Sequence, residues 1–104
     1  FVHVRERVDA TSTVADLAGL CGMRQDVFSR SFARDVGVTP KAYLSDALTR
    51  KISRFLLTSR LSIKEIADEL NFSSQYYLSR FFKKQTQLSP RDYRSAFLAE
   101  SAGE

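Results

Sequence analysis

Two segments of the chain, fifty residues apart, carry the same polar side chains at the same spacing. Each holds a glutamine, a serine and an arginine: Gln25, Ser29, Arg30, Gln75, Ser79 and Arg80. An arginine can bind guanine O6 and N7 with two hydrogen bonds, a glutamine can bind adenine, and a serine leaves room for a close approach to a base edge. The chemistry that this pattern favours is hydrogen bonding to bases in the major groove.

The residue after each glutamine differs between the two segments. Asp26 can accept a hydrogen bond from cytosine N4, although its charge would repel phosphate. The alternative is an acidic residue that only favours the dipole at the start of a helix. Tyr76 is expected on the same helical stripe as Arg80, where it either contacts DNA or is a plain surface aromatic.

Catalytic and metal chemistry have little support. The only histidine is His3 and the only cysteine is Cys21, so neither a metal site nor an internal disulfide is expected. No nucleophile–base pair and no Gly-rich phosphate loop is present, and we therefore expect neither an enzyme nor a cofactor. Cys21 is expected to be a small core residue, in a protein of a reducing compartment.

An internal repeat organises the chain. Residues 14–18 match 63–67, residues 28–32 match 78–82, and residues 39–43 match 89–93. The offset changes from 49 to 50, so the second copy has one extra residue in its turn. The pattern predicts two copies of one helical unit.

Each copy begins with a short helix and a tight turn. Thr13 with Asp16, and Ser62 with Glu65, have the spacing of capping boxes. Gly22 and Asn71 suit the left-handed backbone of the turns that follow. The second helices are expected at about 25–36, ended by Gly37, and 75–87, the latter capped by Ser74.

Two Ser/Thr-Pro pairs then restart helices, with proline at the first helical position. The helix from Pro40 to about Leu57 is expected to join the copies, and the last helix to run from Pro90 to about Ala99. With a short helix before Asp9, the fold is expected to be all-α with about seven helices. It would consist of two homeodomain-like helix-turn-helix subdomains on a linker helix. The expected boundaries in this single domain, 1–104, are about 9–39, 40–57 and 61–99.

Helical spacing places most aromatic residues in the core. These are Phe28, Phe32, Tyr43, Phe55, Phe72, Tyr77, Phe82 and Tyr93. The linker helix has its own apolar stripe: Tyr43, Leu44, Ala47, Leu48, Ile52, Phe55 and Leu56. The second helix of each copy would therefore bury one face and present its polar residues outward.

The charge of the chain is concentrated in two blocks. Residues 23–60 hold eight Lys and Arg against three Asp, and residues 71–99 hold five against one, within a net charge of +4. A basic balance agrees with a nucleic-acid partner without establishing one. The residues expected to contact phosphates are Arg34, Thr39, Lys41, Ser74, Lys83, Lys84, Ser89 and Arg91.

The chain resembles the AraC/XylS-type transcription regulators, and the likeness extends from Asp9 to Leu98. It is most specific in residues 61–67, 71–84, 88–90 and 93–94. The resemblance implies two helix-turn-helix subdomains whose recognition helices enter successive major-groove segments. It implies base contacts at Gln25, Asp26, Ser29, Arg30, Gln75, Tyr76, Ser79 and Arg80. The chain departs from the family pattern at Asn71 (usually Gly), Leu48 (commonly Arg) and Ile52 (commonly Ala), and Asp26 and Ala33 make the first copy less basic.

The expected function is sequence-specific binding of double-stranded DNA that regulates bacterial transcription initiation in the cytoplasm, with contact to RNA polymerase. The sequence has neither a signal peptide nor a membrane-spanning run. Because the chain opens on Phe1 and not on Met, a fragment of a longer regulator is expected. Effector binding and dimerisation would belong to another domain. The alternative is a helical protein-interaction module, which would have no salt-dependent affinity for DNA.

Overall fold

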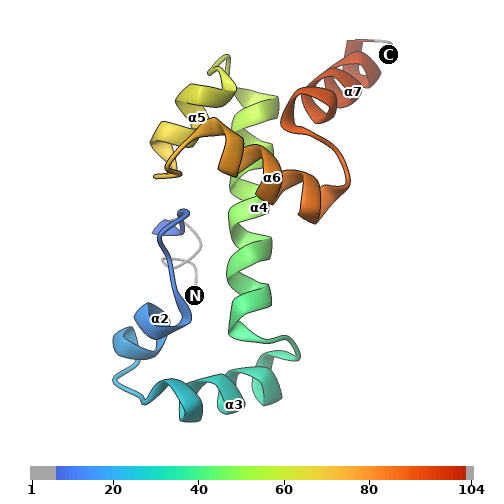
Figure 1. Cartoon of the computed structure of the whole chain (residues 1–104). Helices are drawn as coiled ribbons and strands as arrows, with labels where there is room; N and C mark the ends of the chain where they lie inside the picture. The colour runs from blue at the N-terminus through green and yellow to red at the C-terminus, as the bar shows by residue number, and fades with distance from the viewer. Residues whose placement is uncertain (1–6, 103–104) are drawn as a thin grey trace. The chain divides into compact units, whose positions relative to one another are not determined.

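The computed structural model describes the backbone of residues 7–102 and the side chains of 7–98. The chain divides into two compact units, Phe1–Leu48 (unit 1) and Thr49–Glu104 (unit 2). Residues 7–102 form six α-helices and no strand (Figure 1), which confirms the all-α fold. The helix expected before Asp9 falls mainly on residues 1–6, as does His3, and these residues lie outside the described part of the chain. No helix in the described part is long and apolar enough to cross a membrane.

Unit 1 is built from two short helices and the beginning of a third. Helix α2 (Val14–Leu20) packs against α3 (Gln25–Val36). The Thr13 hydroxyl accepts a hydrogen bond from the Asp16 N–H, and the Asp16 carboxylate accepts one from the Thr13 N–H. This confirms the first capping box and fixes where α2 begins. Helix α3 buries Phe28 and Phe32.

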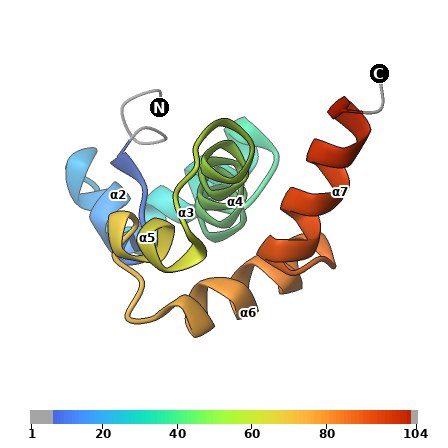
Figure 2. The ribbon, with the colours of Figure 1, turned by 90° about the horizontal axis from the view of Figure 1, so that it is seen from above.

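Unit 2 repeats this arrangement and adds a third helix. Helix α5 (Ile63–Glu69) packs against α6 (Gln75–Thr86), which in turn packs against α7 (Pro90–Ala102), as Figure 2 shows from above. The second capping box joins Ser62 and Glu65, and these hydrogen bonds hold the pKa of the Glu65 carboxyl below its usual value. The Ser74 hydroxyl caps α6, as expected, by accepting from the Tyr77 N–H.

The turns between the first and second helices have the same geometry in both units. Gly22 and Asn71 adopt left-handed backbone angles, with φ of 65° and 59°. The N–H of Met23 donates to the Ala18 carbonyl at 3.0 Å, and the N–H of Phe72 donates to the Ala67 carbonyl at 2.9 Å. These bonds satisfy a carbonyl at the end of each helix, and both predicted turns are confirmed.

The repeat extends to tertiary packing. The rings of Phe32 and Tyr43 meet edge to face at 5.4 Å in unit 1, and those of Phe82 and Tyr93 do so at 5.0 Å in unit 2. Each pair joins the second helix to the helix that follows it. Edge-to-face pairs of this kind stabilise a core beyond the area they bury, so the same contact fixes the second helix in both copies.

Helix α4 (Pro40–Thr58) contains the boundary between the units. Five residues of its predicted apolar stripe are buried, while Tyr43 and Phe55 are half-buried; the buried ones are Leu44, Ala47, Leu48, Ile52 and Leu56. Leu48 and Ile52, which depart from the family pattern, are thus core residues here. Their apolar side chains contribute to burial rather than to polar contacts.

Two expected core residues are exposed. Cys21 follows the last residue of α2, where its short side chain does not reach the core; at the equivalent position Leu70 is longer and is buried. Tyr77 is 55% exposed because it lies in the first turn of α6, about 100° around the helix from the buried Leu78. The prediction of a buried side chain was wrong at both positions.

The C-terminal end of α6 carries a strained residue that mutation can relieve. Gln87 has a φ of 68° at the position where unit 1 has Gly37, with a φ of 89°. Glycine pays no steric penalty there, so Gln87→Gly is expected to raise the free energy of unfolding by about 0.5–1 kcal/mol. Urea denaturation measures the change. An unchanged or lower stability would show that the Gln87 side-chain bond to the Lys84 carbonyl outweighs the strain.

Candidate nucleic-acid interface

Helix α6 separates a buried face from a polar one. Leu78 and Phe82 are completely buried, whereas Gln75, Tyr76 and Arg80 are exposed and Ser79 is half-buried. The separation follows from helical spacing, since residues three and four apart share a face. The outward orientation predicted for these four residues is therefore confirmed, while their contact with DNA remains a prediction.

Three of these residues line one open hollow in unit 2. Its volume is about 360 Å³, and its walls also come from the starts of α5 and α7; the lining residues are Ile63, Gln75, Tyr76, Ser79, Ser89, Pro90 and Arg91. The hollow thus places predicted base contacts beside Ser89 and Arg91, which are predicted phosphate contacts. Base edges and phosphates adjoin in a groove, so this juxtaposition suits a duplex.

Tyr76 and Arg80 interact with each other along α6. The Arg80 Nη1 donates to the Tyr76 Oη at 3.4 Å, and the guanidinium carbon lies 5.7 Å from the centroid of the tyrosine ring. The ring of Tyr77 meets that of Tyr76 edge to face at 5.5 Å. The outer face of α6 therefore holds a connected aromatic–arginine cluster at the surface.

Helix α3 presents the equivalent residues of unit 1 with different contacts. Gln25, Asp26 and Arg30 are exposed and Ser29 is half-buried. Asp26 accepts two hydrogen bonds from Arg24, from Nε at 3.2 Å and from Nη2 at 2.8 Å. The hydrogen bond from Arg24 is the main reason that the pKa of the Asp26 carboxyl is lowered, with a smaller effect of the Arg30 charge.

Arg24 is a surface residue that was not among the predicted site residues. It precedes the first residue of α3 and makes no side-chain cap, and its side chain is 80% exposed. Because it pairs with Asp26, it offsets the negative charge that would oppose phosphate at this helix start. A basic residue two positions before an acidic one was the available sequence signal.

Three predicted phosphate contacts are helix caps. The hydroxyl of Ser74 caps α6, that of Thr39 accepts from the Ala42 N–H at 3.1 Å, and that of Ser89 accepts from the Asp92 N–H at 3.1 Å. A hydroxyl that accepts a backbone bond still carries a hydrogen to donate. Each cap can therefore donate to a phosphate oxygen without leaving its helix.

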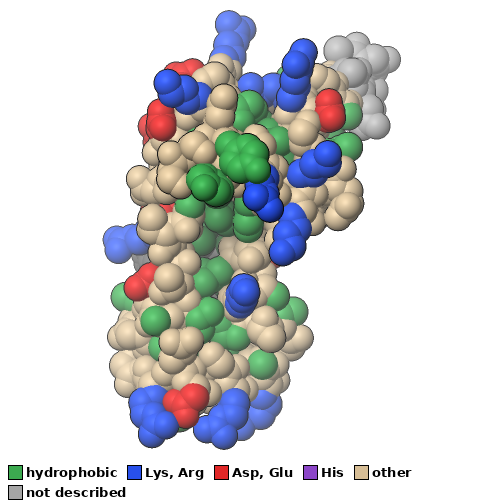
Figure 3. Space-filling model, viewed as in Figure 1, with side chains coloured by type: hydrophobic (Ala, Val, Ile, Leu, Met, Phe, Trp, Pro, Cys, Tyr) green, Lys and Arg blue, Asp and Glu red, His purple; other side chains and the backbone are tan. Residues whose placement is uncertain are grey.

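The other predicted phosphate contacts are exposed cations. They are Arg34, Lys41, Lys83, Lys84 and Arg91. Arg34 lies beside Asp35, with Nε and Oδ1 3.4 Å apart, so part of its charge is offset. Figure 3 shows basic side chains gathered over α6 and α7, and a carboxylate among basic side chains at the edge of unit 1 where α3 lies.

The two units differ in charge. Residues 49–104 hold ten Lys and Arg against six Asp and Glu, which gives +4, whereas residues 1–48 hold six of each and are neutral. An attraction to phosphate falls with the number of cations that can approach it. Unit 2 is therefore electrostatically better suited to a polyanion than unit 1.

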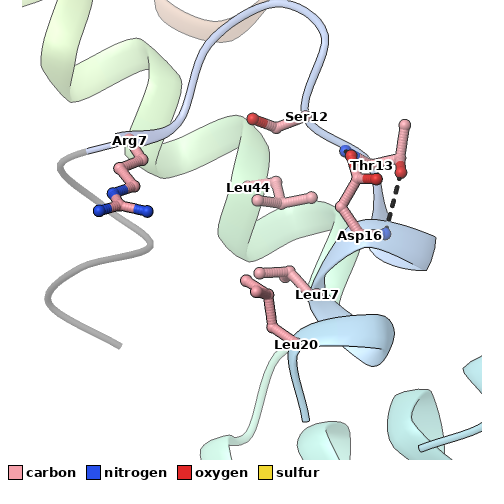
Figure 4. Close-up of a pocket in the computed structure, with 7 residues that line it drawn as sticks. All are labelled: Arg7, Ser12, Thr13, Asp16, Leu17, Leu20 and Leu44. Atoms are coloured by element: carbon pink, nitrogen blue, oxygen red, sulfur yellow. Dashed lines mark hydrogen bonds between the residues drawn. The ribbon is translucent and has the colours of Figure 1, made fainter. Parts of the chain in front are cut away.

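A second hollow, in unit 1, shares no residue with the predicted interface. Figure 4 shows Leu17 and Leu20 of α2 and Leu44 of α4 facing one another within it, with Arg7, Ser12, Thr13 and Asp16 around them. Thr13 and Asp16 are already used in the capping box. Among the described residues no group of three or more His, Cys, Asp and Glu side chains could hold a metal ion.

Two helix pairs with matching turns, each followed by a proline-started helix, define a double helix-turn-helix domain. The family model described as a helix-turn-helix domain matches residues 17–96. The chain belongs to the AraC/XylS-type family of transcription regulators and corresponds to their DNA-binding domain.

Similar proteins agree with this assignment. The chain is 39% identical to the HTH-type transcriptional regulator AlkR of Acinetobacter baylyi over 79% of its own length and 27% of that protein. The DNA-binding domain of AdpA, solved in complex with a target DNA, is 29% identical with a TM-score of 0.83 over 95% of this chain and 89% of that one. The C-terminal domain of AraT, a response regulator from Geobacillus stearothermophilus, is 25% identical with a TM-score of 0.82 over 91% and 79%.

The chain spans less than a third of the length of AlkR and of two further curated relatives, from Bacillus subtilis and Haemophilus influenzae. These relatives are HTH-type transcriptional regulators.

Proposed function

We propose that this domain binds double-stranded DNA sequence-specifically, with α3 and α6 in adjacent major-groove segments, and so regulates bacterial transcription initiation. The observation that carries the proposal is the outer face of α6, where polar residues of the helix adjoin Ser89 and Arg91 around one hollow. Support also comes from the AdpA domain, whose structure contains its target DNA.

Base reading is assigned to the outward faces of the two helices. The residues are Gln25, Asp26, Ser29, Arg30, Gln75, Tyr76, Ser79 and Arg80. Arg30 and Arg80 suit guanine O6 and N7, and the two glutamines suit adenine. Asp26 suits cytosine N4 once Arg24 has offset its charge.

Backbone contacts are assigned to the cations and caps that flank these faces. The residues are Arg34, Thr39, Lys41, Ser74, Lys83, Lys84, Ser89 and Arg91. Such contacts fix the position of a protein on the duplex without reading its sequence. The charge difference between the units indicates that unit 2 supplies more of the affinity.

The domain is proposed to act as part of a longer regulator. AlkR and two further relatives are about three times as long as this chain. Effector binding and dimerisation are therefore assigned to sequence outside these 104 residues. Contact with RNA polymerase and a cytoplasmic location follow from the proposed role in transcription initiation.

Selection of bound sequences from random duplex DNA tests this function. We expect a two-part site with its halves about one helical turn apart. On that site, log affinity should fall steeply with log salt, and Lys83→Ala or Lys84→Ala should each reduce the slope by about 1. Failure to enrich any sequence, or an affinity that does not depend on salt, would instead favour a protein-interaction module.

A further inference from the structure

Tyr76 and Arg80 lie four residues apart on α6, and their side chains touch twice. One contact is the hydrogen bond from Nη1 to Oη, and the other is the guanidinium against the tyrosine ring. Both partners belong to one helix, so the geometry of the pair does not depend on how other elements pack. Tyr76 is 59% exposed and Arg80 is also exposed, which leaves the pair on the surface.

We infer that Tyr76 is a positioning residue. It influences base reading indirectly, by holding the guanidinium of Arg80 in place. This inference rests on the proposed function, in which α6 enters the major groove. The hydroxyl engages one of the five N–H donors of the guanidinium, and the ring restricts where the guanidinium can lie. The remaining donors are then held for a bidentate contact to guanine O6 and N7.

The physical gain is a smaller entropy cost on binding. A long, exposed arginine loses rotamer freedom when it binds a base, and this loss lowers the affinity. An arginine already held by an aromatic neighbour has lost part of that freedom before it meets DNA. Weak surface contacts can therefore contribute to affinity even though they add little to the stability of the fold.

Unit 1 provides an internal comparison. Arg30 is the counterpart of Arg80, and the residue four positions before it is Asp26 in place of Tyr76. The Asp26 carboxylate is engaged by Arg24 at 2.8 Å. The same two helix positions therefore hold an aromatic–arginine pair in α6, while in α3 the first position pairs with a residue before the helix. The inference applies to α6 alone.

A double-mutant cycle tests the inference. DNA affinity is measured for the unaltered protein, Tyr76→Ala, Arg80→Ala and the double variant. Each protein is measured on the selected DNA site and on single-base-pair variants of that site. Tyr76→Ala is expected to weaken binding about two- to tenfold and to lower discrimination at the base pair that Arg80→Ala identifies. In the Arg80→Ala background, the same change should alter affinity by less than about twofold.

Two conservative variants separate the contacts. Tyr76→Phe keeps the ring and removes the hydroxyl, so a smaller loss at the same base pair is expected. Tyr77→Phe is the matched control, because it keeps the ring that packs against Tyr76 and removes only the hydroxyl of a similarly exposed tyrosine. It should leave affinity unchanged. The thermal unfolding midpoint of every variant is expected to match that of the wild type, since Tyr76, Tyr77 and Arg80 are all exposed.

The possible outcomes distinguish the inference from the proposed function. If the Tyr76→Ala and Arg80→Ala effects add, or if Tyr76→Ala alters preference at a different base pair, Tyr76 binds DNA directly and the inference is wrong while the function stands. If Arg80→Ala changes neither affinity nor discrimination, both the inference and the assignment of α6 to the groove are wrong.

Discussion

Arg94→Met is expected to lower the free energy of unfolding by about 2–3 kcal/mol, because it removes charged hydrogen bonds to backbone carbonyls. Arg94 projects from α7 to the end of α4. Its Nε donates to the Leu56 carbonyl at 2.9 Å, and its Nη2 donates to the Ser59 carbonyl at 3.5 Å and to the Leu61 carbonyl at 2.8 Å. One side chain thus satisfies carbonyls of the last turn of α4 and of the loop that leads to α5.

The size of this effect follows from the surroundings of the acceptors. All three hydrogen bonds are partly buried, so water replaces the arginine only incompletely. The last carbonyls of a helix have no partner within the helix, and a cation near them also interacts favourably with the helix dipole. Methionine has a comparable length but no donor, so the packing is largely kept and the polar contacts are lost.

Urea denaturation followed by circular dichroism measures the change. The midpoints of two unfolding curves can be compared directly when the free energy of unfolding depends on urea concentration with the same slope in both. Arg94→Lys should recover only part of the loss, because a compact ammonium cannot span three carbonyls as a planar guanidinium does. Arg91→Met, an exposed arginine at the start of the same helix, should change stability by no more than about 0.5 kcal/mol. Equal midpoints for Arg94→Met and the wild type would contradict the proposed role of Arg94.

Arg80→Ala is expected to weaken binding to the selected site by about 1–3 kcal/mol and to relax specificity at one base pair. Arg80 is exposed on the face opposite Leu78 and Phe82, so its removal should leave the core intact. Arg30→Ala is expected to act in the same direction at a base pair in the other half of the site. Its effect should be smaller, because unit 1 has no net charge to hold α3 against the phosphates.

Competition binding against single-base-pair variants of the site measures both effects. Lys84→Ala is a suitable comparison, since loss of a phosphate contact weakens binding about equally for all sequences. Affinity that both arginine variants leave unchanged would show that neither helix reads bases in the way proposed.

Much of the fold could be predicted because its determinants are local. The capping boxes at Thr13 and Ser62 each depend on a partner three residues away, and the turns at Gly22 and Asn71 depend on one residue's tolerance of positive φ. A repeat strengthens such predictions, because each feature occurs twice. The outward face of α6 could also be predicted, since helical spacing alone determines it.

Long-range contacts could not be predicted from such local patterns. The partners of Arg94 lie 33 to 38 residues away, and no pattern in the sequence connects them. Cys21 and Tyr77 were expected in the core because their spacing fits a buried face, yet each lies at an end of its helix. Periodicity gives the direction of a side chain, whereas burial also depends on whether neighbouring elements extend that far.

Side-chain pairs within the candidate interface form a third group. Arg24 with Asp26, and Tyr76 with Arg80, are close in sequence, so the chance of contact was visible. The choice among rotamers was not, because several partners compete for each guanidinium at the surface. The identity of the interface residues could thus be predicted, but their mutual contacts could not.

The central claim, that α3 and α6 read guanines from the major groove, is tested most directly by methylation interference on the selected site. Methylation of guanine N7 blocks the acceptor that a bidentate arginine uses. The account predicts that such methylation prevents binding at guanines in both halves of the site, and that Arg80→Ala abolishes the interference in one half only. Binding that tolerates N7 methylation throughout the site would contradict it.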